Sequence, residues 1–294
     1  YQPDLIVSRF WLPFMGPSVG TIQRLAGKRA VRVGLIDNAL PHESRPGDRP
    51  LTRWYLGSLD AALVMSQAVA DDLARLGFRK PVARAPHPVY DNFGAPATRE
   101  EAIQSLGLSA NATWLLFFGF IRPYKGLDLA IEALASPLLR QREDLRLLVA
   151  GESYTDTAPW RDLAERLGVA DRIVWHEQYI PTERVRYYFG AADLVVQPYK
   201  SATQSGITQI AYHFGKPMVV TRVGGLPEMV PHERAGLVVP PTAEAIAEAI
   251  ARYLDDEHLR QQLEKGVREV ARQYTWAHLA ETLLALASAS RDKS

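Results

Sequence analysis

The stretch WLLFFGFIRPYKGLDLAIEALA, residues 114–135, decides the fold class. It opens with a continuous apolar run of strand length that ends on glycine. It closes with apolar residues at three- and four-residue steps, which is typical of an amphipathic helix. The same alternation recurs through the rest of the chain, and apolar strands joined by helices predict a parallel sheet covered on both faces. The sequence therefore predicts an α/β fold built from βαβ units.

The other predicted elements follow from the same two patterns. In the second two-thirds of the chain we expect strands at 145–150, 172–176, 193–197 and 217–221. Helices are expected there at 159–167, 181–192, 205–215, 242–255, 257–274 and from 276 to about 288. The first part gives strands at 5–7, 31–36, 61–66 and 81–88, and helices at 51–59 and 67–76.

Two Rossmann-like domains are expected, with a boundary in the polar stretch 91–112. We divide the chain into an N-terminal domain at 1–105, a C-terminal domain at 106–274 and a last helical segment at 275–294. A doubly wound domain usually has about 100–150 residues. This sequence starts directly in a strand, without a glycine-rich first strand–loop–helix turn, so the first domain is expected to be incomplete at its N-terminus.

Composition excludes several classes of function. The chain has 294 residues, a formal net charge of +1 and no cysteine. A dedicated nucleic-acid binder would carry a strong basic excess, and disulfide or thiolate chemistry needs cysteine. No apolar run approaches the roughly 18 residues of a membrane-spanning helix, and the first residues do not resemble a signal peptide. We expect a cytoplasmic protein, with peripheral membrane association left open.

Two strand ends of the C-terminal domain carry candidate ligand-binding residues. The loop from Gly119 to Gly126 holds Arg122 and Lys125, and a guanidinium near an ammonium suits the oxygens of a diphosphate. The segment ATQSG, residues 202–206, precedes an apolar helix. Its hydroxyls would be ordinary helix caps, but a helix N-terminus also binds anions, and Gly206 permits close approach. A solvated basic loop is the alternative for the first segment.

The N-terminal domain has its own polar cluster after the strand at 31–36. Asp37, Asn38, His42 and Glu43 share one loop, which suggests an acceptor-side or catalytic role, although single histidines are usually structural. The segment RFWLPFMGP, residues 9–17, is aromatic and proline-rich, and a modest basic run follows it at 24–32. Core packing would explain the aromatic segment, and a solvated face would explain the basic run. A surface that meets an acceptor or an anionic lipid is the alternative.

Taken together in sequence order, the C-terminal motifs resemble the nucleotide-sugar domain of family 4 retaining glycosyltransferases of the GT-B fold. The motifs are Phe118-Gly-x-x-Arg-x-Tyr-Lys-Gly126, Val149-Ala-Gly151, Ala191-Ala-Asp193, Gly215-Lys-Pro217, Val223-Gly-Gly-Leu-Pro-Glu228 and Gly236-Leu-Val-Val-Pro240. The resemblance covers residues 114–274 and continues more weakly through 9–14, 37–43 and 87–91. It implies two Rossmann-like domains that face across a cleft, with a last helix that returns to the first domain.

The resemblance also implies roles for individual residues. The catalytic set would be His42, Arg122 and Lys125. The donor-binding set would be Gly119, Glu152, Tyr179, Thr203, Gln204, Ser205, Gly206 and Gln209. The acceptor side would be Asp37, Asn38 and Glu43. No cofactor is implied, and the fold normally works without a bound metal. No Asp-x-Asp metal motif is present in the sequence.

Two features of the sequence depart from the family pattern. The arginine that usually follows the strand-end glycine is replaced by Phe120, so Arg122 would take over the phosphate contact. Two glutamates that usually contact the sugar and the ribose fall on Ala202 and Ile210. The uncharged side chains after Ala202 would then hold the sugar and ribose hydroxyls. Together with the short first domain, these departures put the rate of turnover in doubt.

The sequence leaves competing functions. The first is a glycosyltransferase that moves a sugar from a nucleoside-diphosphate sugar to a glycan or lipid-linked acceptor. The second is a shortened GT-B remnant that binds a nucleotide or glycan with little turnover. A dinucleotide-dependent oxidoreductase is disfavoured, because no G-x-G-x-x-G follows a strand with an acidic residue about 20 positions later.

Overall fold

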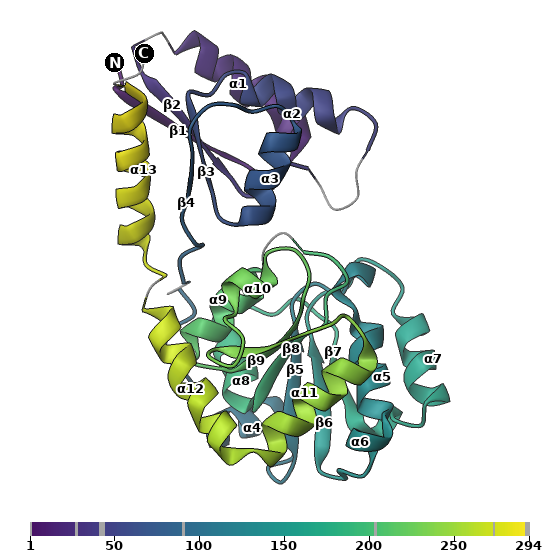
Figure 1. Cartoon of the computed structure of the whole chain (residues 1–294). Coiled ribbons are helices and arrows are strands. Elements are labelled where there is room, and N and C mark those ends of the chain that lie inside the picture. The colour runs from purple at the N-terminus through teal and green to yellow at the C-terminus, as the bar shows by residue number, and fades with distance from the viewer. Residues whose placement is uncertain are drawn as a thin grey trace. The chain divides into compact units, whose positions relative to one another are not determined.

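The computed structural model describes residues 2–26, 29–40, 45–89, 92–202, 205–272 and 274–291. The chain divides into two compact units (Figure 1). The first unit combines Tyr1–Pro88 with Tyr274–Ser294, and the second unit is Val89–Gln273. Each unit has its own parallel sheet, which confirms the predicted α/β fold with two Rossmann-like sheets.

The described part of the first unit contains a parallel sheet in the order β1-β2-β3-β4. Its strands are β1 (Leu5–Phe10), β2 (Val31–Ile36), β3 (Ala61–Val64) and β4 (Val82–Arg84). Its helical segments are η1 (Pro13–Met15), α1 (Gly16–Leu25), α2 (Asp48–Leu56), α3 (Gln67–Arg75) and α13 (Trp276–Arg291). Successive strand residues point to opposite faces, so the two faces have separate cores.

Different helices cover these two faces. On one face, Ile36 and Val64 pack with Tyr55 of α2 and Leu73 of α3. On the other face, α13 packs against β2, β3 and β4, with Leu279 in the apolar cluster. Figure 1 shows α13 on one side of this sheet and α1 to α3 on the other. The last helix of the chain is therefore part of the first unit.

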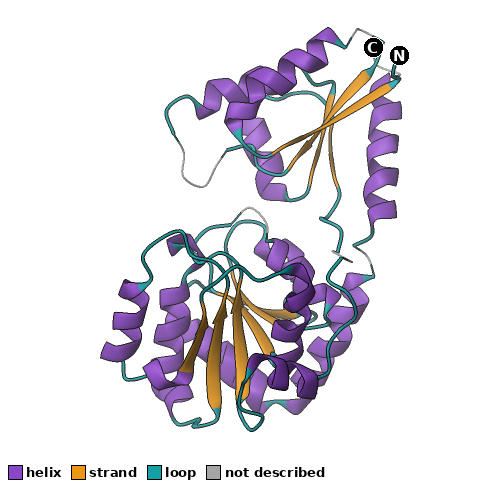
Figure 2. Ribbon diagram, turned by 180° about the vertical axis from the view of Figure 1, so that it is seen from behind, coloured by secondary structure: helices purple, strands orange, loops and turns teal. Residues whose placement is uncertain are grey.

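The second unit contains a larger parallel sheet in the order β10-β9-β8-β5-β6-β7. Its strands are β5 (Thr113–Phe118), β6 (Leu145–Ala150), β7 (Ile173–His176), β8 (Leu194–Gln197), β9 (Met218–Thr221) and β10 (Gly236–Val239). Figure 2 shows helices on both faces of this sheet. The helical segments of this unit are α4 (Arg99–Leu106), η2 (Pro123–Lys125), α5 (Leu127–Ala135), α6 (Pro137–Arg140), α7 (Ala158–Arg166), η3 (Ala170–Arg172), α8 (Thr182–Ala191), α9 (Gly206–His213), α10 (Leu226–Met229), α11 (Ala243–Asp255) and α12 (Glu257–Ala271).

The central strand β5 explains why this sheet is buried on both faces. Leu115 and Phe117 belong to a core that includes residues of α5 and α11. On the opposite face, the ring of Phe118 lies 5.1 Å from that of Phe189 in α8. Because all pairs are parallel, the loops that follow the strands gather at the carboxyl edge of the sheet. The starts of the strands gather at the opposite, amino edge.

The structure places residues 89–105 in the second unit, whereas we expected the domain boundary after residue 105. The reason is α4, a helix that the polar composition of this stretch did not suggest. Thr98 and Glu101 form a reciprocal capping box at its start, and α4 packs against α8. Helix α1 was also not predicted, and α2 begins earlier than the expected residue 51.

Candidate functional site

The loop that follows β5 is shaped by glycines that leave no room for a side chain. Gly119 has a φ of +96° and Gly126 a φ of +68°, a region that favours glycine. A Cβ on Gly126 would lie 1.9 Å from the carbonyl oxygen of Pro198. A Cβ on Gly151, at the end of β6, would lie 2.2 Å from the carbonyl oxygen of Gly119. Three strand ends therefore approach one another backbone to backbone.

Lys125 is the charged group of this loop. Its residue is only 7% exposed, and among the described residues no carboxylate forms an ion pair with it. Its Nζ lies 3.2 Å from the position that a Cβ on Gly119 would occupy, and 5.6 Å from the ring centre of Tyr199. Burial, and after it the positive charge of Arg122, lower the pKa of Lys125 to about 8. A buried cation without a counter-ion is a suitable partner for an anionic ligand.

A cavity of about 290 Å³ lies beside Lys125 at the carboxyl edge of the sheet. Its wall includes predicted donor-binding residues from three segments, namely Gly119, Glu152 and Tyr179. The remaining lining is mostly apolar: Phe93, Phe118, Phe120, Gly151, Ile180, Thr182, Val185 and Ile207. An apolar wall with one buried cation suits a flat ring that carries phosphates.

Arg122 lies outside the set of residues that line this cavity. Its guanidinium carbon is 5.8 Å from the ring centre of Tyr154, and that ring lies 5.3 Å from the ring of Phe120. The Tyr154 hydroxyl donates a hydrogen bond of 3.0 Å to Glu152 Oε2. The structure therefore connects Arg122 to the cavity through aromatic contacts.

The N-terminus of α9 lies at the same edge, and Ile207 of its first turn lines the cavity. Ser205 is buried and its hydroxyl donates to Gln197 Oε1 at 2.7 Å. Because Ser205 faces inward, no described side chain caps the N-terminus of α9. The first N–H groups of a helix have no partner within the helix, so the backbone here has donors to offer.

Gln209 of α9 has a buried amide without a partner. The residue is 1% exposed, and neither its Nε2 nor its Oε1 has a hydrogen-bond partner in the described part of the chain. An unsatisfied buried polar group costs about 1–3 kcal/mol, so such a group calls for a partner. The two positions where the family usually has glutamates, Ala202 and Ile210, are buried and apolar.

In the first unit, another cluster of polar residues lies at the ends of the strands. Asp37 follows β2, is buried, and forms an ion pair with Arg9, with 2.6 Å between Arg9 Nε and Asp37 Oδ2. His87 is buried after β4, its Nδ1 lies 2.8 Å from the carbonyl oxygen of Pro88, and burial lowers its pKa. The charges of Asp37 and Arg9 act on His87 in opposite directions. Neither Arg9 nor His87 was singled out as a functional residue.

Some predicted residues cannot be located in this way. Four of them, His42, Glu43, Thr203 and Gln204, lie outside the described residues. Asn38 is half-buried directly after Asp37.

Across the described ranges, no group of three or more histidine, aspartate or glutamate side chains is arranged to hold a metal ion. None of the helices described is long and apolar enough to cross a membrane.

Comparisons with known proteins agree with this geometry. Residues 98–270 match the family model for glycosyl transferases group 1. The chain is 31% identical over 301 residues to a D-inositol 3-phosphate glycosyltransferase of Saccharomonospora viridis, covering 96% of this chain and 69% of that protein. It is 34% identical over 303 residues to the protein of that name from Segniliparus rotundus, covering 97% and 66%. The corresponding relative from Corynebacterium efficiens is matched over only 47% of its length, so the chain spans 47% to 69% of these relatives.

Solved structures with the same fold are found at lower sequence identity. A sucrose-phosphate synthase from Thermosynechococcus elongatus has a TM-score of 0.79 at 22% identity, over 99% of this chain and 74% of that one. The protein HepE of Anabaena, solved in complex with UDP, has a TM-score of 0.80 at 20% identity, over 96% of this chain and 79% of the other. These likenesses concern the fold.

Proposed function

Because the chain belongs to the group 1 family of glycosyl transferases, we propose that it is a retaining glycosyltransferase that takes its sugar from a nucleoside-diphosphate sugar. One observation carries this proposal. The buried ammonium of Lys125 has no carboxylate partner among the described residues, and it lies at the wall of an apolar cavity. An apolar cavity with a buried cation accommodates a base and a diphosphate together. The HepE structures were solved with UDP and with UDP-glucose, which supports a nucleotide of this kind.

In the proposed reaction, the bond between the sugar and the diphosphate breaks while the acceptor oxygen attacks the same face of the sugar. Negative charge builds up on the leaving diphosphate, and positive charge builds up on the sugar. Lys125 and the N–H groups at the start of α9 stabilise the leaving charge, with Arg122 at the outer side. In this proposal the positive charge at the diphosphate comes from protein groups, so the reaction needs neither a metal nor a cofactor.

In this proposal, uncharged side chains bind the hydroxyl groups of the sugar and the ribose. The amide of Gln209, which has no partner in the described part of the chain, would accept from and donate to ligand hydroxyls. Thr203 and Gln204 would complete the polar set, and Ser205 would support it through its hydrogen bond to Gln197. Glu152 and Tyr179, on the cavity wall, would contact the nucleoside. Since a polar site discriminates against a ligand that leaves its buried groups unpaired, Gln209 is expected to influence donor choice.

We assign the acceptor to the first unit. Asp37, Asn38 and Glu43 are the acceptor-side residues, and His42 is the candidate base or positioning group. A glycan or lipid-linked acceptor fits the exposed apolar side chains of this unit, which include Trp11, Leu12, Phe14, Ile22, Leu25 and Trp54. The names of the relatives favour a second acceptor, D-inositol 3-phosphate. Both acceptors belong in the test.

A binding protein without turnover is the second candidate function. It is favoured by the buried apolar residues Ala202 and Ile210, which occupy the places of the usual sugar and ribose glutamates. Such a protein would bind the nucleotide through Lys125 and the apolar cavity, and it would not transfer the sugar.

Thermal-shift measurements with UDP, GDP and ADP sugars test the proposal, followed by transfer assays with a glycan, a lipid-linked sugar and D-inositol 3-phosphate. We expect one nucleotide sugar to raise the melting temperature and one acceptor to be glycosylated with retained anomeric configuration. Stabilisation without hydrolysis or transfer would favour the binding protein. If none of the nucleotides stabilises the chain, the donor assignment is wrong.

A further inference from the structure

A second and larger cavity, of about 560 Å³, lies at the amino edge of the sheet of the second unit. It is lined by residues at the starts of β5, β6, β8 and β9 and by side chains of α11 and α12. These residues are Thr113, Arg142, Asp144, Leu145, Ala192, Asp193, Phe214, Gly215, Lys216, Pro217, Tyr253, Leu254, Arg260, Glu264 and Arg268. In a parallel sheet the amino edge is opposite to the carboxyl edge, so this cavity is separate from the one beside Lys125.

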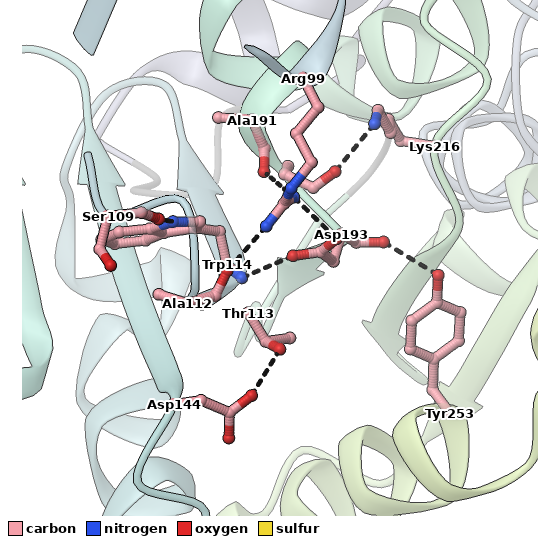
Figure 3. A network of polar contacts seen from close by, with 11 residues as sticks. Arg99, Ser109, Ala112, Thr113, Trp114, Asp144, Ala191, Asp193, Lys216 and Tyr253 are labelled. Atoms are coloured by element: carbon pink, nitrogen blue, oxygen red, sulfur yellow. Dashed lines mark hydrogen bonds and ion pairs between the residues drawn. The ribbon is translucent and has the colours of Figure 1, made fainter. Parts of the chain in front are cut away.

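The inner wall of this cavity is held by polar contacts (Figure 3). Asp193 is anchored by the Trp114 N–H, which donates to Oδ2 at 2.7 Å, and by Arg99, which donates to Oδ1 at 2.9 Å. Tyr253 donates to the carbonyl oxygen of Asp193 at 2.9 Å, and Thr113 donates to Asp144 at 2.9 Å. These contacts hold the wall in place. The carboxylate of Asp193 is paired with Arg99, which does not line the cavity.

Within the described ranges, no ion pair joins the cations of the cavity to the acids that line it. Arg142 pairs with Asp255, which is outside the lining, and its buried Nε has no partner among the described residues. Lys216 is half-buried, and its Nζ donates to the carbonyl oxygen of Ala192 at 2.8 Å. An ammonium has two further N–H donors, so Lys216 can also donate to a ligand.

Helix α12 presents the remaining charges at four-residue steps. Arg260, Glu264 and Arg268 therefore lie on one face of the helix, where opposite charges normally pair. Within the described ranges, however, no ion pair joins Glu264 to either arginine. Arg260 approaches only Glu257, at 3.9 Å, and Arg268 has no ion pair or hydrogen bond there. The face thus offers two guanidinium groups with a carboxylate between them.

We propose that this cavity is a second ligand site, which binds a small phosphate ester of a sugar. Arg260, Arg268 and Lys216 would hold the phosphate, since guanidinium groups pair with phosphate oxygens through two parallel hydrogen bonds. Asp144 and Glu264 would accept hydrogen bonds from sugar hydroxyls. The volume falls within the range of small-molecule sites, about 300–1,000 Å³. This site does not depend on the proposed transferase activity.

The polar lining of the amino-edge cavity is the reason why we propose a sugar phosphate as its ligand. Most ligand cavities are lined mainly by apolar groups, as is the one beside Lys125, and such a lining suits a flat base. Here the aromatic lining residues, Phe214 and Tyr253, are both buried, and the wall is dominated by charged side chains. A phosphate with hydroxyl groups uses both the cations and the acids, whereas inorganic phosphate alone uses only the cations.

Isothermal titration of the whole chain with glucose 6-phosphate tests this site, with inorganic phosphate and glucose as separate arms. The Arg268→Ala variant should weaken binding about tenfold, because a charge-assisted contact is lost. The Glu264→Gln variant should weaken binding of the ester roughly threefold, because a neutral amide oxygen accepts hydrogen bonds from the sugar hydroxyls more weakly than a carboxylate does. The Lys265→Ala variant is the matched control: it removes one cation from the same helix outside the lining, and affinity should not change.

Three results would overturn the proposal. The first is the absence of measurable binding of the ester by the unaltered chain. The second is binding that Lys125→Ala abolishes and Arg268→Ala leaves intact, which would place the phosphate at the other edge of the sheet. The third is inorganic phosphate binding as tightly as the ester, which would reduce the cavity to a site for a free anion. None of these results would contradict nucleotide-sugar binding beside Lys125, so the two proposals fail separately.

Discussion

The two edges of the sheet in the second unit present positive charge in different ways. At the carboxyl edge, Lys125 lies in a loop whose glycines touch neighbouring backbone, so the position of the charge is fixed by the main chain. At the amino edge, Arg260 and Arg268 extend from one side of α12, and their charges lie at the ends of long side chains. Substitutions of the loop glycines at the first edge should therefore act through the fold, and substitutions of the two α12 arginines at the second edge should act through charge.

The largest effect is expected from Gly126→Ala. The new Cβ would lie 1.9 Å from the carbonyl oxygen of Pro198, and the φ of +68° is already unfavourable for alanine. We expect a loss of about 3 kcal/mol or more in the free energy of unfolding, measured by urea denaturation. Gly107→Ala is the matched control, since Gly107 has a φ of +65° and open space around its Cβ. It should lose only about 1 kcal/mol, and equal losses would show that the backbone contact is unimportant.

Asp193→Ala probes the wall of the amino edge. The buried N–H of Trp114 would lose its acceptor and Arg99 would lose its ion pair, so stability should fall by about 2 kcal/mol. Asp193→Asn keeps an acceptor for Trp114 and should cost less. For comparison, Glu269→Ala removes an exposed partner of Arg234 and should cost no more than about 0.5 kcal/mol. A loss as small for Asp193→Ala would mean that the wall does not depend on this residue.

Lys125→Ala tests the carboxyl edge by affinity. Removing a buried charge-assisted contact should weaken binding of the nucleoside diphosphate about 10- to 100-fold in a titration. Lys200→Ala removes a neighbouring cation that is half-exposed and paired with Asp128, and it should leave the affinity unchanged. Equal affinities for all three proteins would mean that the diphosphate binds elsewhere.

The smallest effect is a pH dependence with opposite signs for stability and for binding. The pKa of Lys125 in the folded chain, about 8, lies below the ordinary lysine pKa of 10.5. Between these values the unfolded chain binds more protons, so the unliganded protein should gain stability as the pH rises. The diphosphate needs the charged ammonium, so its affinity should fall severalfold from pH 7 to pH 9. Titrations of Lys125→Ala should show no such fall, and an equal fall there would assign the effect to another group.

Much of the second unit could be predicted from sequence, because its strands are apolar runs, and β5 and β6 end directly before a glycine. The strand at 114–118 and the helix after Gly126 were predicted close to their observed bounds. Helix α4 was missed because its surface is polar, although the capping box of Thr98 and Glu101 was visible in the sequence. Helix α1 was missed because its apolar residues Ile22 and Leu25 are exposed, so no buried stripe marks the helix.

The candidate site was predictable as a set of strand ends, but the direction of its side chains was not. The cavity wall does include Gly119, Lys125, Glu152 and Tyr179, while the roles assigned to them remain predictions. The contact of Ser205 with Gln197 could not be foreseen, because the two residues meet only when β8 and α9 pack together. The amino-edge cavity was also invisible in sequence, since its charges come from segments far apart in the chain.

The return of the chain to the first unit has a consequence for the order of folding on the ribosome. The second unit is one continuous segment, Val89–Gln273, so all of its strands and helices have been synthesised before α13 is made. The first unit lacks one cover of its sheet until Leu279, Leu286 and Ala287 of α13 arrive. During translation, therefore, the half of the protein that begins first is completed last. A released chain truncated before Trp276 should hold a protease-resistant second unit and a first unit that is still cleaved.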